Sequence, residues 1–242
     1  MNKNSITLLG YPVFTGEFSE MLLAENRVIN TINPHSYVVA KNDKLFSNSL
    51  KCSDILLPDG IGIVMAINIL FKKRIKTLTG PDAMNFMLNY AQDSGCRVFF
   101  LGSTDFVLNL IEGKCAGLYP NIKIDSYSPP FIDEFSVEDN NLMIERVNKF
   151  NSDILFVGMT APKQEKWVYT NHKLINARKV LAVGAAFDWF CGVQKIPSKV
   201  WVNMGLGWFV RFLGEPKRMF RRVFISSPIY VVDVITVFFT KK

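Results

Sequence analysis

Asp59 is the first residue whose type and setting could support a reaction. It follows the apolar residues 55–57 and lies between Pro58 and Gly60. A carboxylate held in a turn after a strand can act as a general base that removes a proton from a hydroxyl group. Pro-Asp-Gly is also favourable turn chemistry, so a purely structural role accounts for the same residues. The spacing leaves both interpretations open.

A second polar stretch covers residues 158–167 and contains Gln164 and Glu165 shortly after Pro162. Proline is favoured in the first turn of a helix, and the two polar side chains would then face the ends of the strands. An acidic residue also stabilises a helix N-terminus through the helix dipole. An ordinary helix start is therefore the alternative to a binding role for Gln164.

A third stretch carries Arg218, Arg221 and Arg222, which are spaced i, i+3 and i+4 and would share one face of a helix. Guanidinium groups bind phosphate through paired hydrogen bonds and also bind anionic lipid headgroups. An exposed basic face can instead be merely solvated. Because these arginines stand beside aromatic residues in the most basic part of the chain, the sequence supports the phosphate or lipid role at least as well as a solvated face.

The net charge of +7 is concentrated near the C-terminus. Residues 195–242 contain nine basic and two acidic side chains, whereas the preceding residues contain 19 of each kind. A neutral body with a basic tail indicates an anionic partner for the tail. A phosphate-bearing ligand, an anionic membrane and a nucleic acid are the candidates.

An alternation of short strands and helices must hold these residues in place. Continuous apolar runs predict strands buried on both faces at 97–103, 153–159 and 179–185, and shorter runs predict strands at 6–9, 28–33, 54–57 and 122–127. Helices are expected at 60–71, 81–94, 104–118, 138–150 and 163–175. This pattern predicts an α/β fold of the Rossmann-like kind, a mostly parallel sheet with helices on both faces.

The alternation stops after Pro197, and the rest of the chain is rich in tryptophan, phenylalanine and arginine. We therefore predict an α/β domain over 1–197 and a C-terminal helical, membrane-binding appendage over 198–242. Pro216, which follows Glu215, is expected in the first turn of an appendage helix.

Ligands of parallel sheets bind at the carboxyl ends of the strands. Functional residues are therefore expected in 58–62, 102–104, 158–164 and 184–188. Gly102 and Gly184 would let the backbone approach a phosphate at the N-terminus of the following helix. A glycine after a strand is also common in an ordinary tight turn.

The sequence offers little support for a metal site. The cysteines form no Cys-x-x-Cys pair, and with only His35 and His172 to join them we expect reduced, mostly buried thiols and no zinc. No Asp-x-Asp pair is present to hold a nucleotide-bound Mg²⁺ or Mn²⁺. No secretory signal precedes the first strand, so the chain is expected in the cytoplasm.

Residues 223–240 are apolar but include Pro228, Asp233 and two serines. A segment this short with an aspartate near its middle makes a poor membrane-spanning helix. We expect a helix that lies on the inner face of the cell membrane, flanked by basic residues. Packing on its own domain or on a neighbouring subunit is the alternative.

Together with residues 31–34 (Thr-Ile-Asn-Pro) and 183–192 (Val-Gly-Ala-Ala-Phe-Asp-Trp-Phe-Cys-Gly), the three stretches resemble the WecG/TagA/CpsF family of glycosyltransferases. The resemblance extends from Val28 to Arg222, with five motifs in the family order. It implies inverting transfer of N-acetylmannosamine from UDP to an undecaprenyl-diphosphate-linked N-acetylglucosamine in the synthesis of teichoic acid or another cell-surface polysaccharide. The related uronic acid, or UDP-glucose in capsule or exopolysaccharide synthesis, are open alternatives for the donor.

The resemblance also implies roles for individual residues. Asp59 corresponds to the family's catalytic base, and Thr31 and Asn33 correspond to a polar pair near the sugar and acceptor. Gln164 and Asp188 fall in segments near the nucleotide, and three appendage arginines would close over the diphosphate. With the two strand-end glycines, the residues expected at the nucleotide or its diphosphate are Gly102, Gln164, Gly184, Asp188, Arg211, Arg218 and Arg221.

The chemistry of such a transfer agrees with these residues. One carboxylate deprotonates the acceptor, and the departing UDP needs positive charge from a metal, arginines or helix N-termini. We expect arginines in that role, with no metal and no cofactor. The expected partners are a UDP-sugar, a polyprenyl-diphosphate-linked sugar and an anionic membrane surface, and self-association is left open.

Two other classes of protein were weighed. A nicotinamide-dependent oxidoreductase lacks support because no strand end carries G-x-G-x-x-G with an acidic residue further on. A nucleic-acid-binding protein would rest on the basic tail alone, and no nucleic acid partner is expected.

Overall fold

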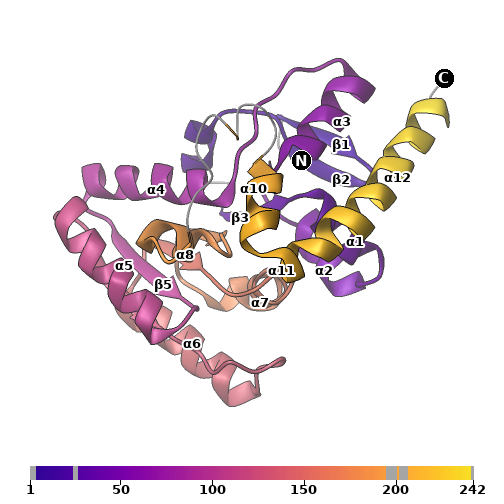
Figure 1. Cartoon of the computed structure of the whole chain (residues 1–242). Coiled ribbons are helices and arrows are strands. Elements are labelled where there is room, and N and C mark those ends of the chain that lie inside the picture. Colours follow the sequence, from indigo (N-terminus) through magenta and orange to yellow (C-terminus); the bar gives the residue numbers. More distant parts are fainter. Residues whose placement is uncertain (1–3, 24–26, 195–200, 202–206, 241–242) are drawn as a thin grey trace.

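The computed structural model describes residues 4–23, 27–194, 201 and 207–240. They form one mixed α/β body with an eight-stranded sheet, and C-terminal helices lie along one side of it (Figure 1). The predicted fold class, a mostly parallel sheet with helices on both faces and a helical C-terminal segment, is confirmed.

The strands run β1 (Ser5–Leu8), β2 (Tyr11–Phe14), β3 (Val28–Ile32), β4 (Ile55–Pro58), β5 (Arg97–Leu101), β6 (Lys123–Tyr127), β7 (Ile154–Val157) and β8 (Lys179–Ala182). Their order across the sheet is β1-β2-β4-β3-β8-β7-β5-β6. Only β1 and β2 pair in the antiparallel sense, and the other pairs are parallel. The carboxyl ends of β3 to β8 therefore meet at one edge.

The helices of the body are α1 (Pro34–Lys41), α2 (Lys44–Lys51), α3 (Ile61–Phe71), α4 (Gly80–Ser94), α5 (Asp105–Leu118), α6 (Val137–Phe150), α7 (Lys163–Asn171) and α8 (Ala186–Cys191). Two short 3-10 helices, η1 (Phe18–Leu22) and η2 (His172–Leu174), complete it. All five helices expected from the sequence are present, although the segment expected at 163–175 is divided between α7 and η2.

Consecutive core residues show how the helices divide between the faces of the sheet. Phe100 packs in a core that includes buried residues of α4, α5 and α8, whereas Phe99 packs in a second core with α6 and α7. Because side chains alternate along a strand, these cores lie on opposite faces. A third core joins α1, α2 and α3 beside β1 and β2.

Three predicted strands, β5, β7 and β8, are buried on both faces, as their continuous apolar runs indicated. The short strand β2 and the helices α1, α2 and α8 were not predicted. The expectation that the thiols are mostly buried was wrong in part: Cys115 is buried, Cys96 and Cys191 are partly exposed, and Cys52 is exposed.

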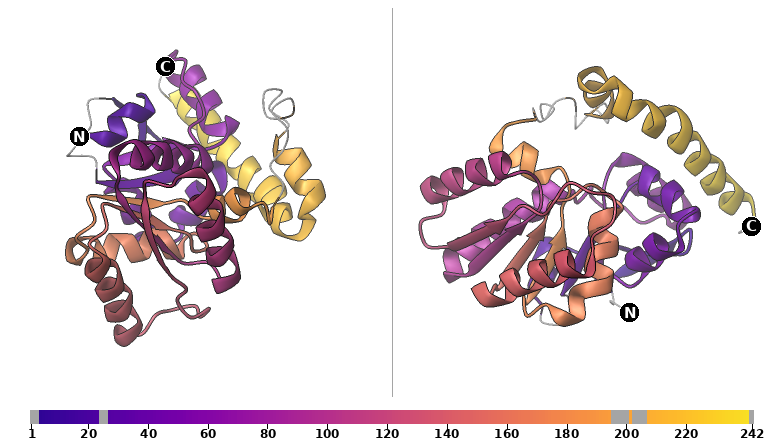
Figure 2. Two further views of the ribbon diagram at one scale, coloured as in Figure 1. Left: turned by 90° about the vertical axis from the view of Figure 1, so that its left-hand side faces the viewer. Right: turned by 90° about the horizontal axis from the view of Figure 1, so that it is seen from below.

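The C-terminal segment comprises α10 (Gly207–Gly214), α11 (Pro216–Phe220), a π-helical turn η3 (Arg221–Ser226) and α12 (Ser227–Thr240). Pro216 occupies the first turn of α11, after the N-cap Glu215, as predicted. Helix α12 lies along α1, on the outside of the body (Figure 2). The boundary expected near residue 197 falls outside the described residues.

Residues Arg221–Thr240 make a continuous helical stretch of 20 residues with mean hydropathy 1.9, which by length and composition alone is enough to cross a membrane. Only 17% of its apolar window is buried against the protein. One side of this stretch therefore contacts the body, and most of its surface does not.

Candidate functional site

The residues that follow β4, β3, β8, β7 and β5 line up along the carboxyl edge of the sheet in that order. They include four of the predicted site residues, Asp59, Asn33, Gly184 and Gly102, together with Gly158. The predicted location of the candidate site, at the carboxyl ends of the strands, agrees with this arrangement. The individual binding roles stay predictions.

Asp59 directly follows β4 and precedes α3. Its backbone N–H donates to the carbonyl oxygen of Ile32 at 2.9 Å, and Ile32 is the register partner of Pro58. The ends of β3 and β4 are thereby tied together at the base of the turn. The carboxylate of Asp59 is partly exposed at this edge, as a general base for a bound hydroxyl group must be.

Thr31 lies on β3 opposite Leu57 of β4. Leu57 belongs to the core covered by α4 and α8, and register partners in parallel strands point to the same face. Thr31 is partly exposed on this face, two residues before the strand-end residue Asn33. The structure therefore brings Thr31, Asn33 and Asp59 to neighbouring positions on two paired strands.

Asn33 is also the N-cap of α1. Its side-chain oxygen accepts from the backbone N–H of Ser36 at 2.9 Å, and the Ser36 hydroxyl donates to the Asn33 carbonyl at 2.9 Å. This reciprocal cap fixes the orientation of the side chain. The backbone N–H of Asn33 completes the cap by donating to the Ser36 hydroxyl at 2.8 Å, whereas the side-chain nitrogen is not part of the cap and can present a donor toward a ligand.

The N-terminus of α4 reaches the same edge, which the sequence analysis did not foresee. Leu78 donates its backbone N–H to the carbonyl of Pro58 at 2.9 Å. A Cβ placed on Gly80 would lie 3.0 Å from the carbonyl oxygen of Val183. Helix α4 therefore starts between the ends of β4 and β8. The signal was present in the sequence, because Thr79 and Asp82 have capping-box spacing and form the box.

Gln164 forms a hydrogen bond with the loop that follows β8. Its side-chain oxygen accepts from the backbone N–H of Gly184 at 3.0 Å, and its nitrogen donates to a carboxylate oxygen of Glu165 at 2.8 Å. Both side chains are buried. The structure shows Gln164 bound to protein groups through both of its polar atoms, and its predicted contact with a nucleotide stays a prediction.

Glu165 is a functional candidate that the sequence analysis did not include among the site residues. Burial raises its pKa to about 7, although the hydrogen bond from Gln164 opposes the shift. Its second carboxylate oxygen is buried without a hydrogen-bond partner among the described residues. A neutral, protonated Glu165 is therefore favoured at and below neutral pH. The sequence predicted only that Glu165 is an acidic residue near the start of a helix. Its burial beside the end of a strand depends on contacts that the sequence does not reveal.

Gly102 and Gly184 are required by packing as well as by any ligand. Gly102 has φ +104°, and a Cβ there would lie 2.9 Å from Met159 and 3.0 Å from Gly158. Gly184 has φ +55°, a left-handed conformation that glycine adopts without strain. Asp188 lies partly exposed in the first turn of α8, directly after this loop.

Of the three arginines predicted to bind the diphosphate, Arg221 is the one whose side chain the structure describes. It is exposed at the start of η3. The side chains of Arg211 and Arg218 fall outside the described residues, although α10 and α11 carry their backbone. Burial, together with the charges of Arg222 and Arg221, lowers the pKa of His35 to about 4. Because His35 lies two residues after Asn33, these guanidiniums are close to the candidate site.

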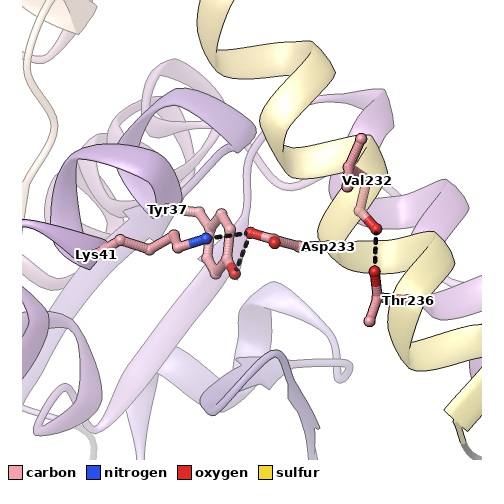
Figure 3. Close-up of polar contacts among 5 residues, drawn as sticks. All are labelled: Tyr37, Lys41, Val232, Asp233 and Thr236. Atoms are coloured by element: carbon pink, nitrogen blue, oxygen red, sulfur yellow. Dashed lines mark hydrogen bonds and ion pairs between the residues drawn. The ribbon is translucent and has the colours of Figure 1, made fainter.

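Three residues of the C-terminal segment, Ser226, Tyr230 and Asp233, fix it on α1 and α3. The Ser226 hydroxyl lies 2.8 Å from Nδ1 of His35, and Tyr230 donates to the carbonyl of Gly62 at 3.3 Å. Asp233 accepts from the Tyr37 hydroxyl at 2.8 Å and pairs with Lys41 at 2.7 Å (Figure 3).

From the sequence, Asp233 was expected only to disfavour membrane insertion, and the structure shows that it docks the helix. Its partners Tyr37 and Lys41 stand far earlier in the chain. The alternative of packing on its own domain therefore holds for one side of α12.

Among the described residues, no group of three or more histidine, cysteine, aspartate or glutamate side chains is arranged to hold a metal ion. The chemistry that can be assigned to this edge is that of a carboxylate, amide groups, helix N-termini and neighbouring guanidiniums.

Comparisons with known proteins agree with the resemblance. The model of the glycosyl transferase WecG/TagA/CpsF family matches residues 5–242. An N-acetylglucosaminyldiphosphoundecaprenol N-acetyl-beta-D-mannosaminyltransferase of Bacillus subtilis strain 168 is 31% identical over 209 residues, which is 86% of this chain and 78% of the relative.

This chain is also similar to proteins of the same name from two other organisms. The one from Bacillus spizizenii strain W23 is 28% identical over 224 residues, covering 92% of this chain and 84% of the relative. The one from Staphylococcus aureus strain MW2 is 27% identical over 209 residues, covering 86% of this chain and 80% of the relative.

Proposed function

Because this chain belongs to the WecG/TagA/CpsF family of glycosyltransferases, we propose that it transfers N-acetylmannosamine from UDP to an N-acetylglucosamine unit carried on undecaprenyl diphosphate. The names of the relatives in two Bacillus strains and in Staphylococcus aureus support this choice of sugar and acceptor. The product would serve the synthesis of teichoic acid or another cell-surface polysaccharide.

The observation that carries the proposal is the position of Asp59. It is a partly exposed carboxylate at the carboxyl edge of the sheet, tied by its backbone to the end of β3. Thr31 and Asn33 approach the same edge from that neighbouring strand. A carboxylate with polar neighbours at a strand end suits a general base that receives a sugar hydroxyl.

The reaction is a single displacement. The Asp59 carboxylate takes the proton of the acceptor hydroxyl while the hydroxyl oxygen attacks the anomeric carbon of the donor. The bond between that carbon and the diphosphate oxygen breaks, and UDP leaves with the electron pair. The configuration of the anomeric carbon is inverted, because attack and departure take place on opposite sides.

The departing UDP gathers negative charge, and preorganised positive groups lower the barrier most when they face that charge. We assign this role to Arg211, Arg218 and Arg221, without a metal ion. The charge of Arg221 already reaches His35, beside Asn33. Removing one such contact should cost about 3 kcal/mol of transition-state stabilisation, or roughly a hundredfold in turnover. Arg218→Ala should therefore lower kcat far more than it raises the KM for the donor.

The enzyme would act at the inner face of the cell membrane, where a polyprenyl-linked acceptor is held. Helix α12 fits peripheral attachment, because it docks on α3 through Tyr230 and on α1 through Asp233, and it leaves its remaining apolar surface uncovered. Deleting residues 223–242 should move the protein from the membrane fraction to the soluble fraction.

A UDP-release assay tests the proposal. The donors are UDP-N-acetylmannosamine, its uronic acid form and UDP-glucose, and the acceptor is a lipid-diphosphate N-acetylglucosamine analogue. Transfer should require the acceptor, prefer the first donor and persist in EDTA. Preference for one of the other donors would show that the enzyme transfers a different sugar from the one proposed, as a related transferase of the same family.

Asp59→Asn should lower turnover at least a hundredfold, which is a typical contribution of a general base. Asp125→Asn is a matched control, because Asp125 is an exposed aspartate on the far edge strand β6. Native turnover in Asp59→Asn, or loss of activity on chelation, would refute the mechanism.

A further inference from the structure

Helix α3 begins two residues after Asp59, and its outer face is apolar. Ile63, Ala66 and Ile67 are buried against the body. On the opposite side Ile61, Met65 and Ile69 are 45%, 52% and 53% exposed. These three residues follow the i, i+4, i+8 spacing of one helical stripe. Surface helices of soluble domains usually carry charged groups there, and α3 contains none.

A basic run follows the apolar stripe directly. Of the five residues that follow Phe71, four are cationic and exposed: Lys72, Lys73, Arg74 and Lys76. Lys73 donates to the hydroxyl of Thr15 at 2.8 Å, and none of the four forms an ion pair with a described residue. An apolar stripe bordered by such a run is complementary to an anionic bilayer surface, which offers acyl chains beneath negative headgroups.

Helix α3 contacts α12 near the start of the stripe. Tyr230 of α12 donates to the carbonyl of Gly62 in α3, and the two helices lie side by side (Figure 1). The exposed apolar residues of α12 are Ile229, Val231, Val232, Ile235, Phe238 and Phe239. The two helices belong to different parts of the chain, so this shared apolar character is not a consequence of one local sequence pattern.

We infer that α3, with its stripe Ile61, Met65 and Ile69 and the basic residues 72–76, is a second bilayer-contacting element of this protein. Two contacts from α3 and α12 fix the orientation of the protein on the membrane, whereas one helix alone leaves rotation about its axis free. Because α3 starts beside Asp59, the orientation they fix turns the carboxyl edge of the sheet toward the headgroup layer. This inference rests on the proposed use of a lipid-linked acceptor.

Co-sedimentation of the full-length chain with vesicles tests the contact. The vesicles are phosphatidylcholine alone or an equal mixture of phosphatidylcholine and phosphatidylglycerol. Met65→Ser/Ile69→Ser should weaken binding to the mixed vesicles about tenfold, because two half-exposed apolar side chains no longer enter the interface. Lys73→Gln/Arg74→Gln should weaken it by roughly fivefold per charge, and only on the anionic vesicles.

Val137→Ser/Leu174→Ser is the matched control, because these residues are 70% and 60% exposed on elements away from α3. The control should bind as the unmodified chain does. Equal binding by the control and the stripe variant would overturn the inference. So would native vesicle binding by the stripe variant combined with a lower mass in light scattering, which would identify the stripe as a contact between copies of the chain.

Activity separates this inference from the proposed function. Met65→Ser/Ile69→Ser should retain transfer to a short-chain, water-soluble acceptor and should lose about tenfold of transfer to an acceptor embedded in vesicles. If the unmodified chain transfers no sugar to either acceptor, the proposed function fails, and the vesicle experiment still decides whether α3 contacts lipid.

Discussion

Helices α6 and α12 have opposite patterns of burial. Helix α6 buries Met143 and Val147 and exposes charged residues such as Glu145. Helix α12 turns Tyr230 and Asp233 toward the body and exposes Val232 and its other apolar residues. The first pattern is that of an ordinary amphipathic helix in water.

The difference indicates that the outer surroundings of the two helices are not the same. An apolar face that is retained on the outside implies a partner that is itself apolar. The hydroxyl groups of α12 agree with this, because Thr236 donates to the carbonyl of Val232 at 2.9 Å within the helix (Figure 3). Helix α6 is therefore held by the core, whereas α12 contacts the body through Tyr230 and a few polar groups and leaves most of its apolar surface uncovered.

The strongest test of this comparison is a pair of truncations to alanine. Met143→Ala should lower the free energy of unfolding by about 3 kcal/mol, because it leaves a cavity in the core. Val232→Ala should change it by no more than about 0.5 kcal/mol, since the side chain is 61% exposed. Urea unfolding measures both values. Similar losses in the two variants would show that α12 is packed like a body helix.

The body and the C-terminal segment also differ in the pKa values of their carboxyl groups, as Glu165 of α7 and Asp233 of α12 show. Asp233 has a pKa below its ordinary value, because hydrogen bonds from Lys41 and Tyr37 outweigh the effect of partial burial. Glu165 is buried and has a pKa raised to about 7. A raised pKa means that the folded protein keeps its proton while the unfolded chain releases it, so stability falls as pH rises from about 4.5 to about 7.

Glu165→Gln removes this penalty. The variant should therefore gain up to about 3 kcal/mol over the unmodified chain near pH 8 and much less near pH 5. Denaturant unfolding at the two pH values gives the comparison. Glutamine can still accept the hydrogen bond from Gln164, so the loop at Gly184 should stay in place. A gain that does not depend on pH would contradict the assignment of a buried, titrating carboxyl group.

Much of the body could be predicted from the sequence because continuous apolar runs identify buried parallel strands. Strand β2 could not, because Tyr11–Phe14 is short and contains a proline. Its turn has Leu9 in the left-handed region beside Gly10, and leucine is not a residue that signals such a turn. Helices α1 and α2 are only eight residues each, too short for a clear apolar period.

The positions of the site residues followed from the rule for parallel sheets, but their surroundings did not. The sequence placed Asp59 after a strand, and the structure added that its neighbour across the sheet is β3. It placed Asp233 in an apolar tail, and the partners Tyr37 and Lys41 became visible only in the folded chain. Long-range polar contacts of this kind have no local signature.

Substitutions on the outer face of α12 should have a moderate effect on vesicle binding. Phe238→Ser/Phe239→Ser should weaken vesicle binding by about 2 kcal/mol, or roughly thirtyfold, because both rings lose their transfer into the bilayer interface. Unfolding in urea should be unaffected, since the rings are 38% and 66% exposed. Co-sedimentation of this variant beside Val137→Ser on α6 makes the comparison direct. Unchanged vesicle binding would mean that the apolar face serves another partner.

The smallest effect concerns the joint between the two regions, where His35 contacts Ser226 of η3. Burial and, to a smaller extent, the charges of Arg222 and Arg221 together lower the pKa of His35 to about 4. If the C-terminal segment detaches, His35 returns toward its ordinary pKa near 6.5. The detached form then binds a proton that the docked form rejects. Docking is accordingly favoured above about pH 6.5 and weakens as the pH falls toward about 4.

Near pH 5.5 the loss should be about 1 kcal/mol, visible as a fivefold faster proteolytic cleavage within 221–226 than near pH 7.5. His35→Gln is the control, because glutamine can bond to the Ser226 hydroxyl and does not titrate. Its cleavage rate should be the same at both pH values. Equal acceleration in His35→Gln would assign the pH dependence of docking to a group other than His35.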